Sequence, residues 1–232
     1  MKHLNLTRLP KEICALKGLK VLNLSDNQLS QLPQEITELT ELEEINLRNN
    51  QLSELPLELI ELRGLKELWL GTNQLVSIPA DIGQLLGLEN LYLYDNQLKQ
   101  LPPEIGQLVS LRNLYLDNNE LLTLPEEIGN LFNLRELVLS YNQLITLPIG
   151  IGDLTQLEVL YLQNNQLKRL PEEIGNLQNL EDLYIDNNQI AQLPEEIGQL
   201  SQLKYLYAQN NLFSSSEQER IKQLLPDTEV YF

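Results

Sequence analysis

Side chains able to perform acid–base or nucleophilic chemistry are scarce in this sequence of 232 residues. The single histidine, His3, lies near the N-terminus, far from any plausible serine or cysteine partner. A catalytic triad or a thiol–imidazole pair needs such a partner within hydrogen-bond reach, so we expect neither. A glycine-rich phosphate loop and a zinc-spaced set of cysteines are also lacking. The sequence therefore predicts no catalytic residue, no metal site and no cofactor.

Adjacent carboxylates, such as Glu126 with Glu127 and Glu195 with Glu196, are the remaining candidates for acid–base catalysis. An acidic residue recurs every 23 residues, two places after a proline, with Gly150 as an exception. Carboxylates at that place are stabilised by the unpaired N–H groups at the start of a helix. We therefore interpret the pairs as helix-start and solvating charges. The recurring acidic positions are Glu12, Glu35, Glu58, Asp81, Glu104, Glu127, Glu173 and Glu196.

Aromatic residues offer a different chemistry, that of binding surfaces. Tyrosine and tryptophan combine apolar area with a polar tip and dominate the energetics of protein interfaces. The only tryptophan and five of the nine tyrosines recur at a spacing that is a multiple of 23 residues. These positions are Trp69, Tyr92, Tyr115, Tyr161, Tyr184 and Tyr207, with Tyr231 extending the row and Tyr94, Tyr141 and Tyr205 beside it.

The elements that position these residues are set by a repeat of 23 residues that runs through almost the whole chain. A fixed period of this length is typical of a solenoid, in which each unit stacks only on its neighbours. Columns of leucine, as in Leu39 and Leu62, and of proline, as in Pro33 and Pro56, keep the same step. The clearest column is one of asparagine: Asn27, Asn50, Asn73, Asn96, Asn119, Asn142, Asn165, Asn188 and Asn211.

The unit itself has a known pattern. Residues 19–29 read LKVLNLSDNQL, which matches LxxLxLxxNxL, and later units continue as LPxEIGxLxxL. The sequence therefore resembles the leucine-rich repeat family in its 23-residue form. Within that family it is similar to leptospiral bacterial proteins and to the eukaryotic Ras-associated group. The resemblance implies an α/β solenoid, a horseshoe with a concave parallel β-sheet and short helices or 3₁₀ turns on the convex side.

Each column of the unit has a physical reason. In LxLxx, leucines such as Leu114 and Leu116 point inward from a short strand while Asn113, Tyr115 and Asp117 point outward, because side chains alternate along a strand. The turn after the strand leaves backbone N–H and C=O groups without ladder partners. An asparagine amide offers two donors and an acceptor on a short stem, so we expect the asparagine column to satisfy those groups.

The pattern of the convex segment predicts one short turn of helix. In LPEEIGNLFNL, Leu124, Ile128 and Leu131 fall at i, i+4 and i+7, which places them on one apolar stripe of a short helix or 3₁₀ turn. The preceding proline suits a first helical turn, where its missing N–H group costs nothing. The segment IGIGDL, residues 149–154, departs from the usual EEIGNL.

The C-terminal residues differ from the repeat and predict a cap. Ser216 and Glu219 have the spacing of a capping box at the start of a helix that Pro226 ends. Residues 229–232 then alternate as a final strand that places Tyr231 on the concave face. We expect the solenoid to occupy residues 1–212, with a partial first unit and nine strand units, and the cap to occupy residues 213–232.

The aromatic column, placed on the outward face of the strands, predicts a binding surface. The alternative is that rings on neighbouring strands only stack and stabilise the sheet. Outward acidic residues, Asp182 among them, lie beside the column, with Arg48, Arg112 and Arg135 as the main basic exceptions. The predicted partner-binding residues are Trp69, Tyr92, Tyr94, Tyr115, Tyr141, Tyr161, Tyr184, Tyr205, Tyr207, Glu67, Asp117, Glu136 and Asp186.

Charge limits the partners. Acidic residues number 33 against 16 basic ones, for a net charge of −17. This balance repels a phosphate backbone and an anionic membrane surface, so we expect no nucleic-acid binding. No stretch approaches the roughly 20 apolar residues of a membrane-spanning helix. A monomer is the favoured oligomeric state. Cys14, the single cysteine, is expected to be structural.

The N-terminus leaves localisation open. Leu4 occupies the position of Asn27 one unit earlier, so the chain begins in mid-unit, without the first strand. Either the chain begins with a partial cap, which fits a cytoplasmic protein, or a leader was removed, which fits a secreted or bacterial surface protein.

The sequence thus predicts a non-enzymatic module that binds a protein or peptide partner on a concave aromatic and acidic face. The leptospiral resemblance implies a role in host–pathogen interaction. The resemblance to the Ras-associated group implies instead an intracellular scaffold for a small GTPase. A third hypothesis is a glycan-binding module, because stacked aromatic residues near Asp and Asn suit a sugar.

Overall fold

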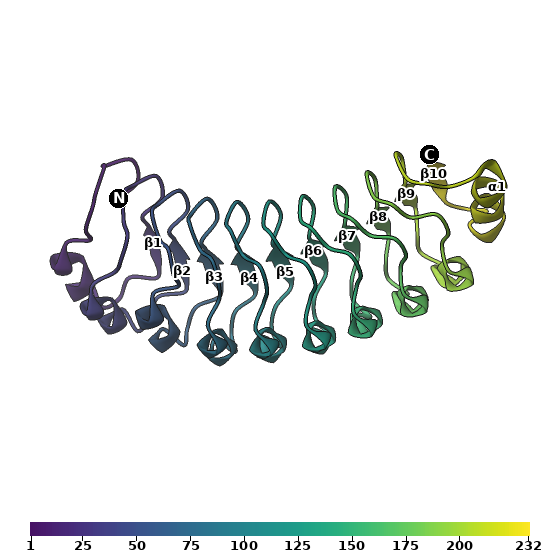
Figure 1. The fold of residues 1–232 in the computed structure, drawn as a ribbon. Helices are drawn as coiled ribbons and strands as arrows, with labels where there is room; N and C mark the ends of the chain where they lie inside the picture. The colour runs from purple at the N-terminus through teal and green to yellow at the C-terminus, as the bar shows by residue number, and fades with distance from the viewer.

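The computed structural model describes all 232 residues as a curved row of similar units (Figure 1). Ten short strands form one parallel sheet in the order of the sequence. Partners in neighbouring strands lie one repeat apart, as for Leu91 with Leu114. The strands are β1 (Val21–Asn23), β2 (Glu44–Asn46), β3 (Glu67–Trp69), β4 (Asn90–Tyr92), β5 (Asn113–Tyr115), β6 (Glu136–Val138), β7 (Val159–Tyr161), β8 (Asp182–Tyr184), β9 (Tyr205–Tyr207) and β10 (Glu229–Tyr231).

Nine 3₁₀-helices line the convex side of the curve (Figure 1). The sequence predicted a short helix or 3₁₀ turn, and each segment is a five-residue 3₁₀-helix. The prediction that proline lies in the first turn is wrong by one place. Pro125, for example, is the extended N-cap residue, and its carbonyl accepts the first hydrogen bond, from Ile128 N–H (3.1 Å). The helices are η1 (Lys11–Ala15), η2 (Gln34–Glu38), η3 (Leu57–Glu61), η4 (Ala80–Gln84), η5 (Pro103–Gln107), η6 (Glu126–Asn130), η7 (Ile149–Asp153), η8 (Glu172–Asn176) and η9 (Glu195–Gln199).

Leucine and isoleucine fill the space between the sheet and the short helices. Leu114 and Leu116 from the strand, with Ile128 and Leu131 from the convex side, are fully buried, as predicted. One continuous cluster of 63 buried residues extends through every unit, so no unit has a core of its own. Each unit therefore depends on its neighbours for stability. No helix in the structure is both long and apolar enough for a membrane span.

The asparagine column bonds the turns as predicted, and it does so across units. Asn119 is buried, and its side-chain oxygen accepts the N–H of Leu98 in the preceding unit (3.0 Å). Its side-chain nitrogen donates to the carbonyl of Leu93 in that unit and to the carbonyl of Leu116 in its own unit, both at 3.0 Å. One amide thus satisfies three buried backbone groups and ties two units together.

The C-terminal cap consists of α1 (Ser215–Leu224) and β10. The predicted capping box of Ser216 and Glu219 is wrong by two residues. Ser214 is the N-cap, because it is the serine with extended backbone, and its hydroxyl accepts the N–H of Glu217 (3.2 Å). Three consecutive serines made the start of the helix ambiguous in the sequence.

The side chain of Glu217 joins the cap to the preceding units. Its buried carboxylate accepts the N–H of Leu193 (3.0 Å) and pairs with Arg220 (2.7 Å). The hydrogen bond from Arg220 lowers the pKa of Glu217, so the group stays ionised. Arg220 also donates to the carbonyl of Leu193. These contacts fasten the cap to the last full units. At the other end, residues 1–20 contain η1 and no strand.

We predict that the asparagine column contributes more to stability than the aromatic column. Asn119→Ala leaves the buried N–H of Leu98 without an acceptor, which costs about 1–3 kcal/mol. It also removes one of the two donors to each of the carbonyls of Leu93 and Leu116, which keep bonds from Asn96 and Asn142. Tyr115→Ser removes a cross-strand contact of about 0.2–1 kcal/mol. Thermal melts of the two variants should therefore show the larger loss for Asn119→Ala, and the opposite order would make the rings the main structural element.

A second prediction concerns the cap. Glu217→Ala removes the acceptor for Leu193 N–H and the partner of Arg220, so hydrogen exchange should accelerate in β8, β9 and η9 and remain unchanged near β4. Glu219→Ala is the matched control, because Glu219 is an exposed residue of the same helix. Equal exchange in the two variants would contradict the role assigned to Glu217.

Candidate functional site

The outward residues of the strands form a row of aromatic rings on the concave sheet. The third residue of each strand supplies the row, and parallel in-register pairing places these residues side by side. The rings of Trp69 and Tyr92 stack with centroids 3.5 Å apart, and those of Tyr92 and Tyr115 with centroids 4.8 Å apart. These distances are close to or below the spacing of about 4.8 Å between neighbouring strands. We call Trp69, Tyr92 and Tyr115 the N-terminal stack.

A second set of rings continues the row after an interruption. Tyr161, Tyr184, Tyr207 and Tyr231 stack at centroid distances of 4.5, 4.6 and 4.8 Å, and we call them the C-terminal stack. Val138 of β6 separates the two stacks. The rings therefore make the cross-strand stacking contacts on which the alternative hypothesis rests. All but Tyr231 are half-buried and Tyr231 is exposed, so the ring edges remain accessible.

Two of the predicted acidic residues bond directly to rings. The indole N–H of Trp69 donates to Glu67 (3.3 Å), and the hydroxyl of Tyr115 donates to Glu136 (2.5 Å). Burial, followed by the bond to Glu136, raises the pKa of Tyr115. Burial raises the pKa of Tyr92 to about 12. Both hydroxyls therefore stay protonated at neutral pH, and that of Tyr115 donates to Glu136.

Two further acidic residues lie on the sheet beside the rings. Asp117 and Asp186 each stand two residues after a ring-bearing position and are half-buried. Burial is the main cause that raises the pKa of both carboxyls. A charge that is poorly solvated in this way is stabilised by an incoming cation. The concave face is thus acidic where the rings are.

Two of the three predicted basic exceptions, Arg112 and Arg135, pair with glutamates at the edge of that face. Arg112 and Arg135 precede their strands and pair with Glu89 (3.5 Å) and Glu158 (2.7 Å). They belong to a charged column along the edge where the strands begin, so their charges are already matched. Arg48 differs, because its guanidinium lies 5.9 Å from the ring centre of Tyr94.

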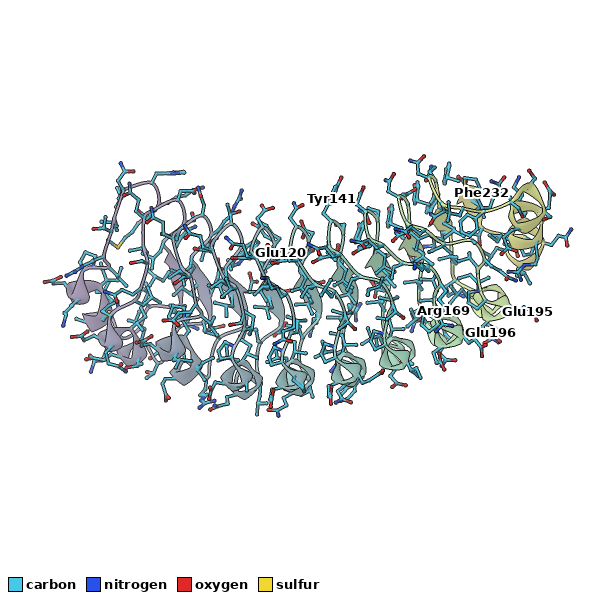
Figure 2. All side chains as sticks on the ribbon, in the orientation of Figure 1. Glu120, Tyr141, Arg169, Glu195, Glu196 and Phe232 are labelled. Atoms are coloured by element: carbon cyan, nitrogen blue, oxygen red, sulfur yellow. The ribbon has the colours of Figure 1, made fainter.

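The flanking tyrosines occupy three different environments. The Tyr94 ring lies against Gly71, where a Cβ atom would approach the ring to 2.5 Å, so a larger residue there would displace the ring. Tyr205 lies beside Tyr207, with ring centres 6.3 Å apart. Tyr141 does not join the rings. It is 55% exposed and stands at the rim formed by the turns, on the side opposite the short helices (Figure 2).

A hollow of about 700 Å³ lies away from the rings, beside the short helices η6 to η9. Arg169 and Glu195 line it with Glu126 (Figure 2 shows Arg169 and Glu195). Glu126 already accepts the N–H of Gly150 at the start of η7 (2.9 Å), which agrees with a helix-start charge. No aromatic ring lines this hollow, and we regard the concave face as the better candidate site.

The residues with catalytic potential lie apart. Cys14 is buried in the core, whereas His3 is exposed and lies 3.6 Å from Asp26. No group of three or more His, Cys, Asp or Glu side chains has the arrangement of a metal site. The chemistry available on the concave face is therefore hydrogen bonding, ring contact and charge.

Comparison with known families supports the architecture. A family model described as a leucine-rich repeat region matches residues 1–100, 80–166 and 149–224. The chain belongs to the leucine-rich repeat family. No curated protein matches the chain. Leucine-rich repeat domains of this fold are typical of interaction modules rather than enzymes.

Three solved leucine-rich repeat structures are similar. A leucine-rich repeat protein of Leptospira interrogans is 35% identical, with a TM-score of 0.69 over 98% of this chain and 76% of its own. A TDR receptor is 31% identical, with a TM-score of 0.86 over 97% of this chain and 40% of its own. The ectodomain of the Arabidopsis thaliana receptor kinase GASSHO1/SCHENGEN3 is 29% identical, with a TM-score of 0.61 over 97% of this chain and 33% of its own. The chain thus spans less than half of the two receptors.

The rim contains one feature that sequence reasoning missed. In each leucine-rich repeat, the residue before the column asparagine has a left-handed backbone. Asn and Asp tolerate this conformation, and a bulky side chain does not. Tyr141, with φ of 55°, is the one aromatic residue at this position. The others are Asp26, Asn49, Thr72, Asp95, Asn118, Asn164, Asn187 and Asn210.

We predict that Tyr141→Asn stabilises the protein by about 1 kcal/mol, because it relieves the left-handed strain of a bulky residue. The reciprocal change in the neighbouring unit, Asn118→Tyr, should destabilise by a similar amount. Chemical denaturation of both variants gives the two differences. If Tyr141→Asn lowers stability, then the exposed ring makes a stabilising contact that outweighs its backbone strain.

Proposed function

We propose that this protein is a non-catalytic module that binds a protein or peptide partner across its concave face. The observation that carries the proposal is the row of half-buried rings on the outward side of β3 to β9. The inward leucines already form the core, so the core does not require these rings. Cross-strand stacking contributes only about 0.2–1 kcal/mol per pair. A surface of tyrosine and tryptophan has the composition of an interface hot spot.

The charge of this face favours a basic or amphipathic partner. Glu67, Glu136, Asp117 and Asp186 lie among the rings, and the nearby Arg112 and Arg135 are already paired. The net charge of −17 extends the attraction beyond the contact itself. Such fields accelerate encounter and orient the partner, and salt screens them.

Similar proteins support partner binding as the function. The GASSHO1/SCHENGEN3 ectodomain was solved in complex with CASPARIAN STRIP INTEGRITY FACTOR 2. The similarity to a Leptospira interrogans protein favours a bacterial version of the proposal, in which the partner is a host protein. The glycan hypothesis is less favoured, because most ring faces are covered by neighbouring rings and a sugar stacks on an open face.

The test begins with the selection of binding peptides from a randomised display library, with this protein as the target. The selected peptides are then titrated against the protein and its variants. Tyr92→Ala combined with Tyr184→Ala, one change in each stack, should weaken binding by at least about 2 kcal/mol, or roughly 30-fold. High salt should weaken binding further.

The matched control is Glu172→Gln combined with Glu195→Gln, two exposed glutamates in the first turns of η8 and η9. This control should change affinity less than about twofold, because it leaves the concave face intact. A loss of binding confined to the control variant would contradict the concave assignment.

A further inference from the structure

The charged column along the edge where the strands begin contains a break in its pattern. The residue before each of the first nine strands supplies the column, and its charge alternates in sign from Lys20 to Arg112. Arg135 then follows Arg112, where the alternation calls for an acidic residue. The column consists of Lys20, Glu43, Lys66, Glu89, Arg112, Arg135, Glu158, Glu181 and Lys204.

The break places two arginines side by side. The backbone N–H of Arg135 donates to the carbonyl of Arg112 (2.8 Å), so the two residues lie on neighbouring strands at the same height. Like charges in such a position repel each other. They are the only two cations of the column that are direct neighbours. The pairing of this edge with glutamates does not by itself explain why a second arginine stands there.

A hollow of about 460 Å³ lies at the two arginines. Its charged lining residues are Lys66, Arg112 and Arg135 against a single carboxylate, that of Glu89. Cations thus outnumber anions three to one, in a protein whose net charge is −17. No hydrophobic side chain lines the hollow, and the neutral lining residues come from the turns that precede the strands: Gly87, Ser110, Asn133 and Gln156.

Both guanidinium groups keep hydrogen-bond donors for a ligand. The Nε of Arg112 lies 3.5 Å from Glu89, and Nη1 of Arg135 donates to Glu158 (2.7 Å). A guanidinium carries five N–H donors, so a glutamate that matches its charge through one nitrogen leaves the others free. The arginine side chains are 58% and 55% exposed. Exposed ion pairs contribute only about 0–1 kcal/mol, so an incoming acceptor can compete with them.

These donors select an oxyanion, and a carboxylate fits best. Arginine binds carboxylates and phosphates through two parallel N–H···O bonds. The two arginines stand about 4.8 Å apart along the sheet, so one small oxyanion can contact both. A phosphate dianion meets stronger repulsion from Glu89 than a singly charged carboxylate does. A polyanion meets the net charge of −17 along its whole length.

We propose that this hollow is a subsite for a carboxylate group of the bound partner, held by Arg112 and Arg135. This inference rests on the proposed concave-face function, because the same partner supplies the carboxylate. Arg112 stands three residues before Tyr115 of the ring row, a distance of about 10 Å along the strand. A partner that covers the rings therefore reaches the hollow with an acidic residue at its flank. Since the rings are similar from unit to unit, this contact would fix the partner's position along the row.

The probe is the tripeptide acetyl-Gly-Glu-Gly-amide, titrated while the arginine Nε–H signals are followed by NMR. The signals of Arg112 and Arg135 should shift and saturate. That of Arg63 should not, because both Nη groups of Arg63 are bonded to Gln84. Acetyl-Gly-Gln-Gly-amide and sodium chloride at equal concentrations should give no saturable shift. Inorganic phosphate should bind more weakly than the glutamate tripeptide.

Arg112→Gln and Arg135→Gln should each weaken tripeptide binding at least about fivefold, reported by the remaining arginine signal. Lys204→Gln is the matched control, because Lys204 belongs to the same column, pairs with Glu181 (2.6 Å) and lies outside the hollow. It should change the affinity less than about twofold.

Four results would each overturn the proposal. They are unchanged affinity in both arginine variants, equal binding of the glutamine tripeptide, tighter binding of phosphate, and no saturable shift at about 100 mM tripeptide.

The library-selected peptides separate this subsite from the proposed function. Peptides that carry an acidic residue and lose affinity both in the Tyr92 and Tyr184 double variant and in Arg112→Gln combined with Arg135→Gln would support both. Peptides that depend on Tyr92 and Tyr184 but tolerate the two arginine changes would overturn the subsite and leave concave binding intact. Peptides indifferent to the ring changes would overturn the proposed function, whereas the tripeptide titration tests the subsite without any contact to the rings.

Discussion

The amide of each column asparagine is the interaction on which the rest of the structure depends. A 23-residue unit must reverse direction inside a leucine core, where backbone groups have no access to water. Asn119 shows the solution, since one side chain satisfies groups of its own unit and of the unit before it. This bond fixes where each turn lies relative to its neighbour. It thereby fixes the strand register, and no unit can shift alone.

The binding surface is a consequence of that fixed register. Because strand partners lie one repeat apart, identical outward positions come within contact distance, and a tyrosine in successive units becomes a stack. A single exception in the sequence then interrupts the stack, as at the buried Val138. The same unit also holds Tyr141 in a left-handed backbone and carries Gly150 at the start of η7. The unit that departs most from the repeat is thus the one where the concave surface changes.

The sequence predicted well wherever one residue type repeats at one spacing. Leu114 and Ile128 had to be inward and Asn119 had to serve the turn, since periodicity alone decides these roles. Prediction from the sequence failed where a contact involves residues outside the repeat, as in the C-terminal cap. Ser214 rather than Ser216 starts α1, and Glu217 bonds to Leu193, a residue 24 places earlier that only the cap geometry brings close. Likewise the sequence marked Arg112 and Arg135 as basic exceptions but did not pair them, and their glutamate partners lie 23 residues away, on neighbouring units.

The central claim is that a partner covers the concave rings, and hydroxyl-radical footprinting of the protein with a captured partner tests it most directly. Aromatic side chains react readily, and the chain offers an internal reference in Phe132, which is exposed in the turn between η6 and β6. The account predicts that the partner protects Trp69, Tyr115 and Tyr161 from oxidation and leaves Phe132 unchanged. Protection of Phe132 with unchanged oxidation of the three concave residues would contradict it.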